Sequence, residues 1–278
     1  MRTLRAGLVQ LRTPADQAAA LAHAAPLIKQ AAGEGAQLIA TPEGSNLLQR
    51  DRARLVAALR RTDEDPFVQG VCALAAELKV WVLIGSALVA RPDGRAANRS
   101  LLVDDAGQIV QSYDKVHMFD VDLPNGDRYR ESALYEPGDS AALARTPWAL
   151  LGLTICYDIR FPGLHRALAQ AGADILTVPA AFTVPTGEAH WEVLLRARAI
   201  ETGAFVVAPA QGGRHEDGRE TWGRSTIVDP WGRVLAKLDH DEPGVIVADL
   251  DLAEVALTRR AIPALANERS FAPPGAAP

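Results

Sequence analysis

The sequence Leu151-Gly-Leu-Thr-Ile-Cys156-Tyr-Asp-Ile-Arg-Phe-Pro162 is the stretch from which we interpret the fold. Its first five residues, 151–155, form an apolar run that is typical of a buried β-strand. Pro162 stands near the first turn of a helical pattern that continues to residue 170, and the missing N–H of proline costs little there. We therefore expect Cys156 to lie on a turn between a strand and a helix, with a thiol pKa lowered by the nearby helix N-terminus.

Two charged residues occupy the same kind of position elsewhere in the chain. Glu43 follows the strand-like run 36–41, and Lys115 follows a second such run at 108–114. Because ligands and catalytic groups in α/β proteins gather at strand ends, we expect a thiol, a carboxylate and an ammonium group to meet. Taken singly, each has a structural alternative, since free cysteines are mostly core residues and loop charges are mostly solvated.

The trio Glu43, Lys115 and Cys156, in this order, resembles that of the nitrilase-type carbon–nitrogen hydrolases, most closely their Nit-type amidase branch. The resemblance covers residues 3–267 and is carried by motifs at 42–44, 113–120, 156–162, 181–191, 196–201 and 223–232. Alternating strands and helices by themselves predict an α/β fold. The resemblance implies a four-layer α-β-β-α sandwich of the nitrilase type, which associates into homodimers or larger homo-oligomers.

The chemistry of amide hydrolysis suits each member of the trio to one role. Cys156 can be the nucleophile, Glu43 the proton carrier, and Lys115 the group that stabilises the oxyanion, together with the backbone N–H of Tyr157. A carboxyl group that carries protons near pH 7 needs a raised pKa, so we expect Glu43 to lie in a dry pocket. The resemblance also implies that Glu131 is a second glutamate that orients the lysine; a loop carboxylate is its structural alternative.

The implied activity is that of a cysteine-dependent amidase, which uses water to hydrolyse a terminal carboxamide to carboxylate and ammonia through a thioester. Residues 182–191 most resemble the branch that acts on deaminated glutathione. An ω-amidase for α-ketoglutaramate-like acids, a nitrilase and an N-carbamoyl amide hydrolase use the same trio and remain open, as does a non-catalytic binding protein. Arg160, Phe182 and Thr183 are candidate substrate-binding residues. Arginine holds carboxylates well, so Arg160, or an arginine of the stretch 127–130, can bind a substrate carboxylate. An ion pair with Asp158 or another acid is the alternative for Arg160.

The composition argues against several other classes of function. The chain has 278 residues, 48% of them hydrophobic, and a net charge of −5, which disfavours nucleic acid and acidic membranes as partners. Two cysteines make no disulfide framework, and neither a signal peptide nor a long apolar run is found, so we expect a cytoplasmic enzyme. No motif indicates a cofactor or a metal; Glu188, His190 and Glu192 are better explained by helix capping or packing.

The order of elements shows neither a linker nor an internal repeat. We predict a single domain at 1–267 and a flexible tail at 268–278. Residues 117–139 have little periodicity, and their place directly after Lys115 favours a wall of the active site. Helices are expected at 15–34, 47–59, 66–78, 190–202 and 252–260, and a hairpin is expected from 98–103 to 108–113.

Overall fold

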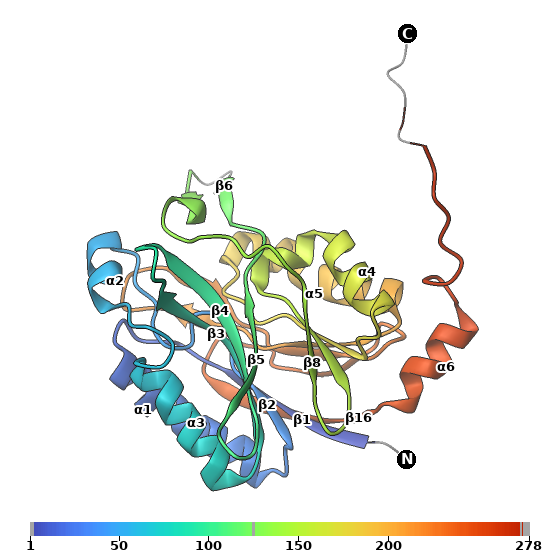
Figure 1. The fold of residues 1–278 in the computed structure, drawn as a ribbon, viewed down its shortest axis with the longest axis horizontal. Helices are drawn as coiled ribbons and strands as arrows, with labels where there is room; N and C mark the ends of the chain where they lie inside the picture. Colours follow the sequence, from blue (N-terminus) through green and yellow to red (C-terminus); the bar gives the residue numbers. More distant parts are fainter. Residues whose placement is uncertain (1–2, 124–125, 273, 275–278) are drawn as a thin grey trace.

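The computed structural model describes residues 3–123, 126–272 and 274, and their strands form two six-stranded sheets (Figure 1). From edge to edge, the first sheet contains β16 (Gly244–Asp251), β1 (Thr3–Gln10), β2 (Leu38–Ala40), β3 (Trp81–Ala90), β4 (Ala96–Val103) and β5 (Ile109–Asp114). The second contains β15 (Val234–Lys237), β14 (Thr226–Val228), β11 (Phe205–Ala208), β10 (Ile175–Thr177), β9 (Leu150–Leu153) and β8 (Ala142–Arg145).

Each sheet has the same internal plan. The pairs β1–β2 and β2–β3 in the first sheet are parallel, and so are β9–β10 and β10–β11 in the second. The outer strands of both sheets pair antiparallel. Because parallel strands end at the same edge of a sheet, the loops that follow them are brought together there.

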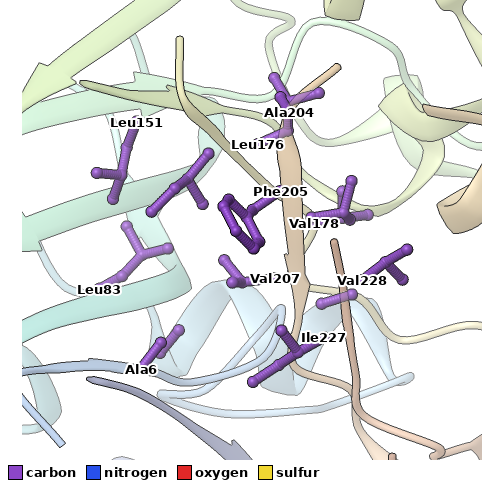
Figure 2. Close-up of a cluster of buried hydrophobic side chains, with 14 of the residues drawn as sticks. Ala6, Leu83, Leu151, Leu176, Val178, Ala204, Phe205, Val207, Ile227 and Val228 are labelled. Atoms are coloured by element: carbon purple, nitrogen blue, oxygen red, sulfur yellow. The ribbon is translucent and has the colours of Figure 1, made fainter. Parts of the chain in front are cut away.

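Helices cover the outer faces of the two sheets. The first sheet packs against α1 (Gln17–Gly33) and α3 (Pro66–Leu78), and the second packs against α4 (Pro162–Gln170) and α5 (Val184–Thr202), on the opposite side of the molecule in Figure 1. Figure 2 shows Ala6 and Leu83 of the first sheet beside Phe205 and Val207 of the second, in one buried cluster. The predicted four-layer sandwich is therefore confirmed.

Local signals set the bounds of α3. The side chain of Asp65 accepts hydrogen bonds from the backbone N–H groups of Phe67 and Val68, and Pro66 occupies the first turn. Both features are favourable at a helix start. The helix ends where Lys79 adopts the left-handed conformation at φ 56°. Structure and prediction agree on the range 66–78 for this reason.

Two predicted helices have different bounds. The helix expected at 47–59 is reduced to α2 (Arg52–Ala58), because Asp51 caps it by accepting a hydrogen bond from the Arg54 N–H. Helix α5 begins at Val184 rather than at 190, with Pro185 in its first turn, where proline is tolerated. The last helix, α6 (Ala253–Ala261), lies close to its predicted range.

Two short hairpins were not expected. One lies within 117–139 and pairs β6 (Asp120–Asp122) with β7 (Arg128–Arg130), followed by the 3₁₀ turn η1 (Glu131–Ala133). The other pairs β12 (Gly212–Arg214) with β13 (Glu220–Trp222). Their strands are only three residues long, which is too short for an alternating hydrophobic pattern to be recognised.

The C-terminal segment makes contacts before the described residues end. Glu268 accepts a hydrogen bond from Arg166 Nε at 2.7 Å and another from Gln170 of α4. The predicted flexible tail, 268–278, therefore begins with a residue that is hydrogen-bonded to α4. Residues 273 and 275–278 lie outside the described residues. Within the part that is described, no helix has the length and apolar character needed to cross a membrane.

Candidate active site

Three loops deliver the predicted trio to one cavity. Glu43 lies on the turn after β2, Lys115 directly follows β5, and Cys156 opens the 3₁₀ turn η2 (Cys156–Arg160) that follows β9. Lys115 Nζ donates to Glu43 Oε1 at 3.0 Å, and Cys156 lines the same cavity as both of them. The structure therefore brings together a thiol, a carboxylate and an ammonium group.

The backbone at Cys156 is strained. Its φ is +48°, in the left-handed region that a residue with a Cβ rarely adopts, and such a residue costs about 1–3 kcal/mol. The Cys156 N–H donates to the carbonyl oxygen of Pro179 at 2.9 Å. The thiol thus lies on a 3₁₀ turn, and the α-helix begins only at Pro162. Strain of this kind persists where surrounding contacts hold the turn in place.

Asp158 holds this turn. Its side chain is fully buried and accepts hydrogen bonds from the Ile155 N–H at 2.8 Å, the Tyr113 hydroxyl at 2.8 Å and the His117 N–H at 3.0 Å. His117 Nδ1 also lies 2.7 Å from Asp158 Oδ1. With these partners, Asp158 makes no ion pair with Arg160 among the described residues, so that alternative for Arg160 is wrong.

Arg160 faces the cavity instead. Its Cζ atom lies 5.4 Å from the ring centre of Phe182 and 6.0 Å from that of Tyr157. Its terminal nitrogens contact His190 Nδ1 at 3.3 Å, and no carboxylate of the described residues pairs with it. Phe182, Thr183 and Tyr157 line the same cavity, so the structure brings together all the predicted substrate-binding and supporting residues.

Lys115 is held by two carboxylates. Besides Glu43, its Nζ atom donates to Glu131 Oε1 at 3.0 Å and Oε2 at 2.8 Å, and its side chain is only 2% exposed. Asn98 Nδ2 donates to Glu43 Oε1 at 2.9 Å and to Glu131 Oε1 at 3.2 Å. Glu131 is therefore a partner of the lysine, as expected. Asn98 was missed, because its place beside Lys115 depends on the pairing of β4 with β5: the Lys115 N–H donates to the Asn98 carbonyl oxygen at 2.9 Å.

The protonation of the trio differs from the expectation. Burial acts to raise the pKa of Glu43, but the Lys115 charge and hydrogen bonds from Cys156, Lys115 and Asn98 outweigh it and lower that pKa. Burial and the neighbouring Glu43 carboxylate raise the pKa of the Cys156 thiol well above its usual value. The predictions of a raised Glu43 pKa and a lowered Cys156 pKa are both wrong.

Lys115 keeps its charge in this environment. Burial favours the neutral amine, but the carboxylates of Glu131 and Glu43 outweigh it and raise the pKa of Lys115 well above its usual value. The resting site therefore contains a neutral thiol, an ionised Glu43 and a charged lysine. An ionised carboxylate whose charge acts on the thiol is suited to accept its proton.

A close approach of two chain segments positions Glu43. A Cβ atom at Gly85 would lie 1.9 Å from the Thr41 carbonyl oxygen and 2.4 Å from Pro179 Cβ, so only glycine fits between these segments. The Ala181 N–H donates to Glu43 Oε2 at 2.9 Å. These contacts link the turn that carries Glu43 to the segment beneath Cys156.

The cavity has a volume of about 400 Å³ and is lined by side chains from both unexpected hairpins. Sequence reasoning missed the lining residues of the second hairpin, because it did not predict the pairing of β12 with β13 that positions them: Arg219, Glu220 and Thr221. The prediction that 117–139 forms a wall of the site is confirmed by Phe119 and by β7 with η1, which all border the cavity.

Comparison with known proteins gives consistent matches over most of the chain. The family model described as carbon–nitrogen hydrolase matches residues 5–260. A deaminated glutathione amidase from Yersinia enterocolitica is 40% identical over 273 residues, which cover 97% of this chain and 94% of that protein.

Solved structures are similar as well. The NitFhit protein of C. elegans superposes with a TM-score of 0.90 at 32% identity, over 97% of this chain and 66% of that one. An amidase variant from Nesterenkonia sp. AN1, in which acrylamide has added to the active-site cysteine, gives a TM-score of 0.76 at 27% identity, over 93% and 97% of the two chains.

Proposed function

Because this chain belongs to the carbon–nitrogen hydrolase family, we propose that it is a cysteine-dependent amidase for small amides that carry a carboxylate. The observation that carries the proposal is that Cys156, Glu43 and Lys115 line one cavity, in which the Lys115 ammonium lies 3.0 Å from the Glu43 carboxylate and which Arg160 also lines. In this proposal Cys156 is the nucleophile and Glu43 its base, Lys115 is the cation for the oxyanion, and Arg160 is the cation for the substrate carboxylate.

In the first half of the proposed reaction, Glu43 accepts the thiol proton as Cys156 Sγ attacks the amide carbon. The carbonyl oxygen becomes an oxyanion, which Lys115 and the backbone N–H of Tyr157 stabilise. Glu43 then gives its proton to the departing nitrogen, the C–N bond breaks, and a thioester on Cys156 remains. Ammonia leaves from a carboxamide, and an amine leaves from a substituted amide.

In the second half, water replaces the leaving group. The water oxygen attacks the thioester carbon while Glu43 accepts a proton from the water. Lys115 and the backbone N–H of Tyr157 stabilise the second oxyanion. The C–S bond then breaks, Cys156 recovers a proton from Glu43, and the carboxylate product leaves. Glu131 and Asn98 position the catalytic groups. Glu131 accepts hydrogen bonds from the Lys115 ammonium. Asn98 donates to the carboxylates of Glu43 and Glu131.

We propose that Arg160 binds the substrate carboxylate. It has no carboxylate partner among the described residues, and it lies over Phe182 at the cavity wall. Arginine stays charged at any working pH and binds carboxylates through two parallel hydrogen bonds. Deaminated glutathione and α-ketoglutaramate both carry a carboxylate near the scissile amide, so both fit this requirement, and the first is the substrate named for the Yersinia relative.

The experiment that tests this function compares kcat/KM for deaminated glutathione, α-ketoglutaramate and a neutral aliphatic amide. We expect both anionic amides to exceed the neutral one. Arg160→Gln should raise KM for the anionic amides by about 10- to 100-fold, the loss of one charge-assisted contact. Arg145→Gln is the matched control, because Arg145 is an exposed arginine of β8 that does not border the cavity. If the neutral amide is the best substrate of wild type, carboxylate recognition is wrong.

We also propose a homodimer that buries an apolar surface formed by α5, by α6 with the residue after it, and by the turn between β14 and β15. The exposed side chains concerned are Val193, Ile200, Trp231, Leu257 and Ile262. Ile200 and Ile262 border the same small cavity, and Gly232, next to Trp231, packs against Ile200. Neighbouring exposed apolar side chains of this kind mark interaction surfaces, and two-fold pairing of identical chains is the commonest way to cover them.

Light scattering should give about twice the chain mass of 29.7 kDa at micromolar concentration. The double variant Val193→Glu with Ile200→Glu should shift it to the monomer, because it would bury unpaired charges in the interface. Val110→Glu, on the exposed face of β5, should leave the dimer unchanged. A wild-type monomer under these conditions would refute the proposal.

The proposed chemistry requires a free thiol at position 156. Cys72 and Cys156 are both free cysteines in the structure. Thiols stay reduced in the cytosol, where glutathione and thioredoxin maintain them. We therefore propose that the enzyme works in the cytoplasm.

A further inference from the structure

We propose that the cavity contains an apolar subsite beside Glu43, which holds an apolar substituent on the nitrogen of the scissile amide. The inference rests on the proposed amidase function and deepens it, because it assigns the leaving-group side of the same site. The substrates it selects are secondary amides that release a small apolar amine. Four leucines from different segments of the chain form the subsite: Leu48, Leu55, Leu88 and Leu134.

Two of these leucines lie next to the neighbours of Glu43. A Cβ atom at Gly44 would lie 2.7 Å from Leu48 Cδ2, so the Leu48 side chain packs against the residue that follows Glu43. Leu88 is paired with Asn98 across β3 and β4, and side chains of directly opposed residues project from the same face of a sheet. Asn98 Nδ2 donates to Glu43 Oε1 at 2.9 Å. Each leucine is thus one neighbour away from Glu43, through Gly44 or through Asn98.

The other two leucines extend this apolar surface. Leu55 of α2 belongs to the same buried apolar cluster as Leu88 and Tyr135, and Leu134 packs against that cluster. All four of these residues also border the cavity, so the cluster opens into it. An apolar group that enters at this point removes both its own surface and that of the leucines from water, which is favourable.

The position beside Glu43 decides which part of the substrate this surface receives. In the proposed reaction Glu43 gives its proton to the departing nitrogen, so that nitrogen lies within hydrogen-bond reach of the Glu43 carboxylate. Arg160 lies on the turn that begins with Cys156, near the rings of Tyr157 and Phe182. A carboxylate on the acyl side therefore points toward Arg160, and a substituent on the nitrogen points toward the leucines.

The subsite has room for a substituent, and its walls are tied together. The cavity volume of about 400 Å³ falls within the range of roughly 300–1,000 Å³ that is typical of ligand pockets. Arg52 Nη2 of α2 donates to the carbonyl oxygen of Ala133 in η1 at 2.9 Å. This hydrogen bond links α2, which carries Leu55, to the turn that precedes Leu134.

The test keeps the acyl group constant and varies the amine. The N-propyl, N-hydroxyethyl and N-carboxymethyl derivatives of α-ketoglutaramate carry substituents of similar size, of which the first is apolar, the second polar and the third charged. We expect kcat/KM of wild type for the N-propyl amide to exceed that for the N-hydroxyethyl amide by about tenfold, and that for the N-carboxymethyl amide by more. The reason is that leucine side chains offer no hydrogen bond to a hydroxyl or a carboxylate.

Two variants locate this preference in the subsite. Leu55→Asn and Leu134→Asn should each lower the ratio of kcat/KM for the N-propyl over the N-hydroxyethyl amide by about three- to tenfold, because an amide replaces an apolar contact. Leu134 is only partly buried, so its variant tests the subsite independently of whether Leu55→Asn folds. Leu235→Asn is the matched control: Leu235 is an exposed leucine of β15 that does not border the cavity, and the ratio should stay that of wild type.

Calorimetry gives a second measurement that does not depend on turnover. The Cys156→Ala protein should bind the intact N-propyl amide about tenfold more tightly than the N-hydroxyethyl amide. Adding Leu134→Asn in that background should reduce this difference, and adding Leu235→Asn should not.

The outcomes separate the subsite from the proposed function. If wild type hydrolyses α-ketoglutaramate but shows no preference for the N-propyl amide, or prefers the N-carboxymethyl amide, the subsite is wrong and the amidase function stands. The subsite is also wrong if both asparagine variants fold and keep the wild-type ratio. If wild type hydrolyses none of these amides, the proposed function fails, and the calorimetric comparison decides the subsite by itself.

Discussion

Cys156→Ala should abolish amide hydrolysis while the fold stays intact. Removal of the nucleophile from a unit of cooperating residues eliminates nearly all of its catalysis, and we expect kcat to fall on the order of 10⁴-fold or more. The substitution adds no backbone strain, because alanine meets the same penalty at φ +48° as cysteine does. Steady-state kinetics and thermal unfolding followed by circular dichroism measure the two effects separately.

The control for this variant is the other cysteine. Cys72 lies in α3, outside the cavity, and Cys72→Ala should keep wild-type kinetics.

Cys156→Ser is a stricter form of the test. A serine hydroxyl is a far weaker acid than a thiol, so an ionised Glu43 with a lowered pKa cannot deprotonate it effectively. A Cys156→Ala enzyme that retained a tenth of wild-type activity would rule out this residue as the nucleophile.

Glu43→Gln should lower kcat by about 10³-fold, because an amide can neither accept the thiol proton nor pass it to the leaving group. The same change should slow alkylation of Cys156 by iodoacetamide. Burial is the largest cause of the raised pKa of this thiol and remains in Glu43→Gln, although the rise due to the Glu43 carboxylate is lost. We therefore expect a thiol that stays protonated at neutral pH and has no base to accept its proton. Kinetics and the rate of alkylation therefore report on the same proton transfer by independent routes.

The pH dependence of kcat/KM tests the direction of the Glu43 pKa shift. The pKa of Glu43 is lowered in the folded protein, so its carboxylate is ionised throughout the neutral range and loses its charge only as the pH falls below the ordinary value of 4.5. The acidic limb of kcat/KM in wild type should lie in that range and should be absent from Glu43→Gln. Glu188→Gln, an exposed residue of α5, is the matched control. Unchanged alkylation and activity in Glu43→Gln would exclude Glu43 as the base.

Several features of the site could be predicted from residues that are close together in the chain. A charged or nucleophilic residue after each strand-like run gave Glu43, Lys115 and Cys156 as candidates, and the family motifs added Glu131 and Arg160. The bounds of α3 followed from Asp65 and Pro66, because a helix cap involves neighbours within one turn. These features can be predicted because the residues that determine them are neighbours in the sequence.

Features that depend on distant contacts were decided by the tertiary structure. The Ala181 N–H that binds Glu43 is 138 residues away along the chain, and the Asn98 amide that binds it is 55 residues away. The direction of each pKa shift is the balance between burial and such partners, so the residue types alone gave the wrong sign for Glu43 and Cys156.

The same reasoning explains the contrast between Asp158 and Arg160. Their proximity in sequence suggested an ion pair, but packing buries Asp158 beneath Tyr113 and His117 and leaves Arg160 facing the cavity. The sequence by itself determined which chemical groups are present and that they follow strands. The tertiary structure decided which of them touch, how their charges balance and which cations remain available to a substrate, because burial and long-range contacts exist only in the folded chain.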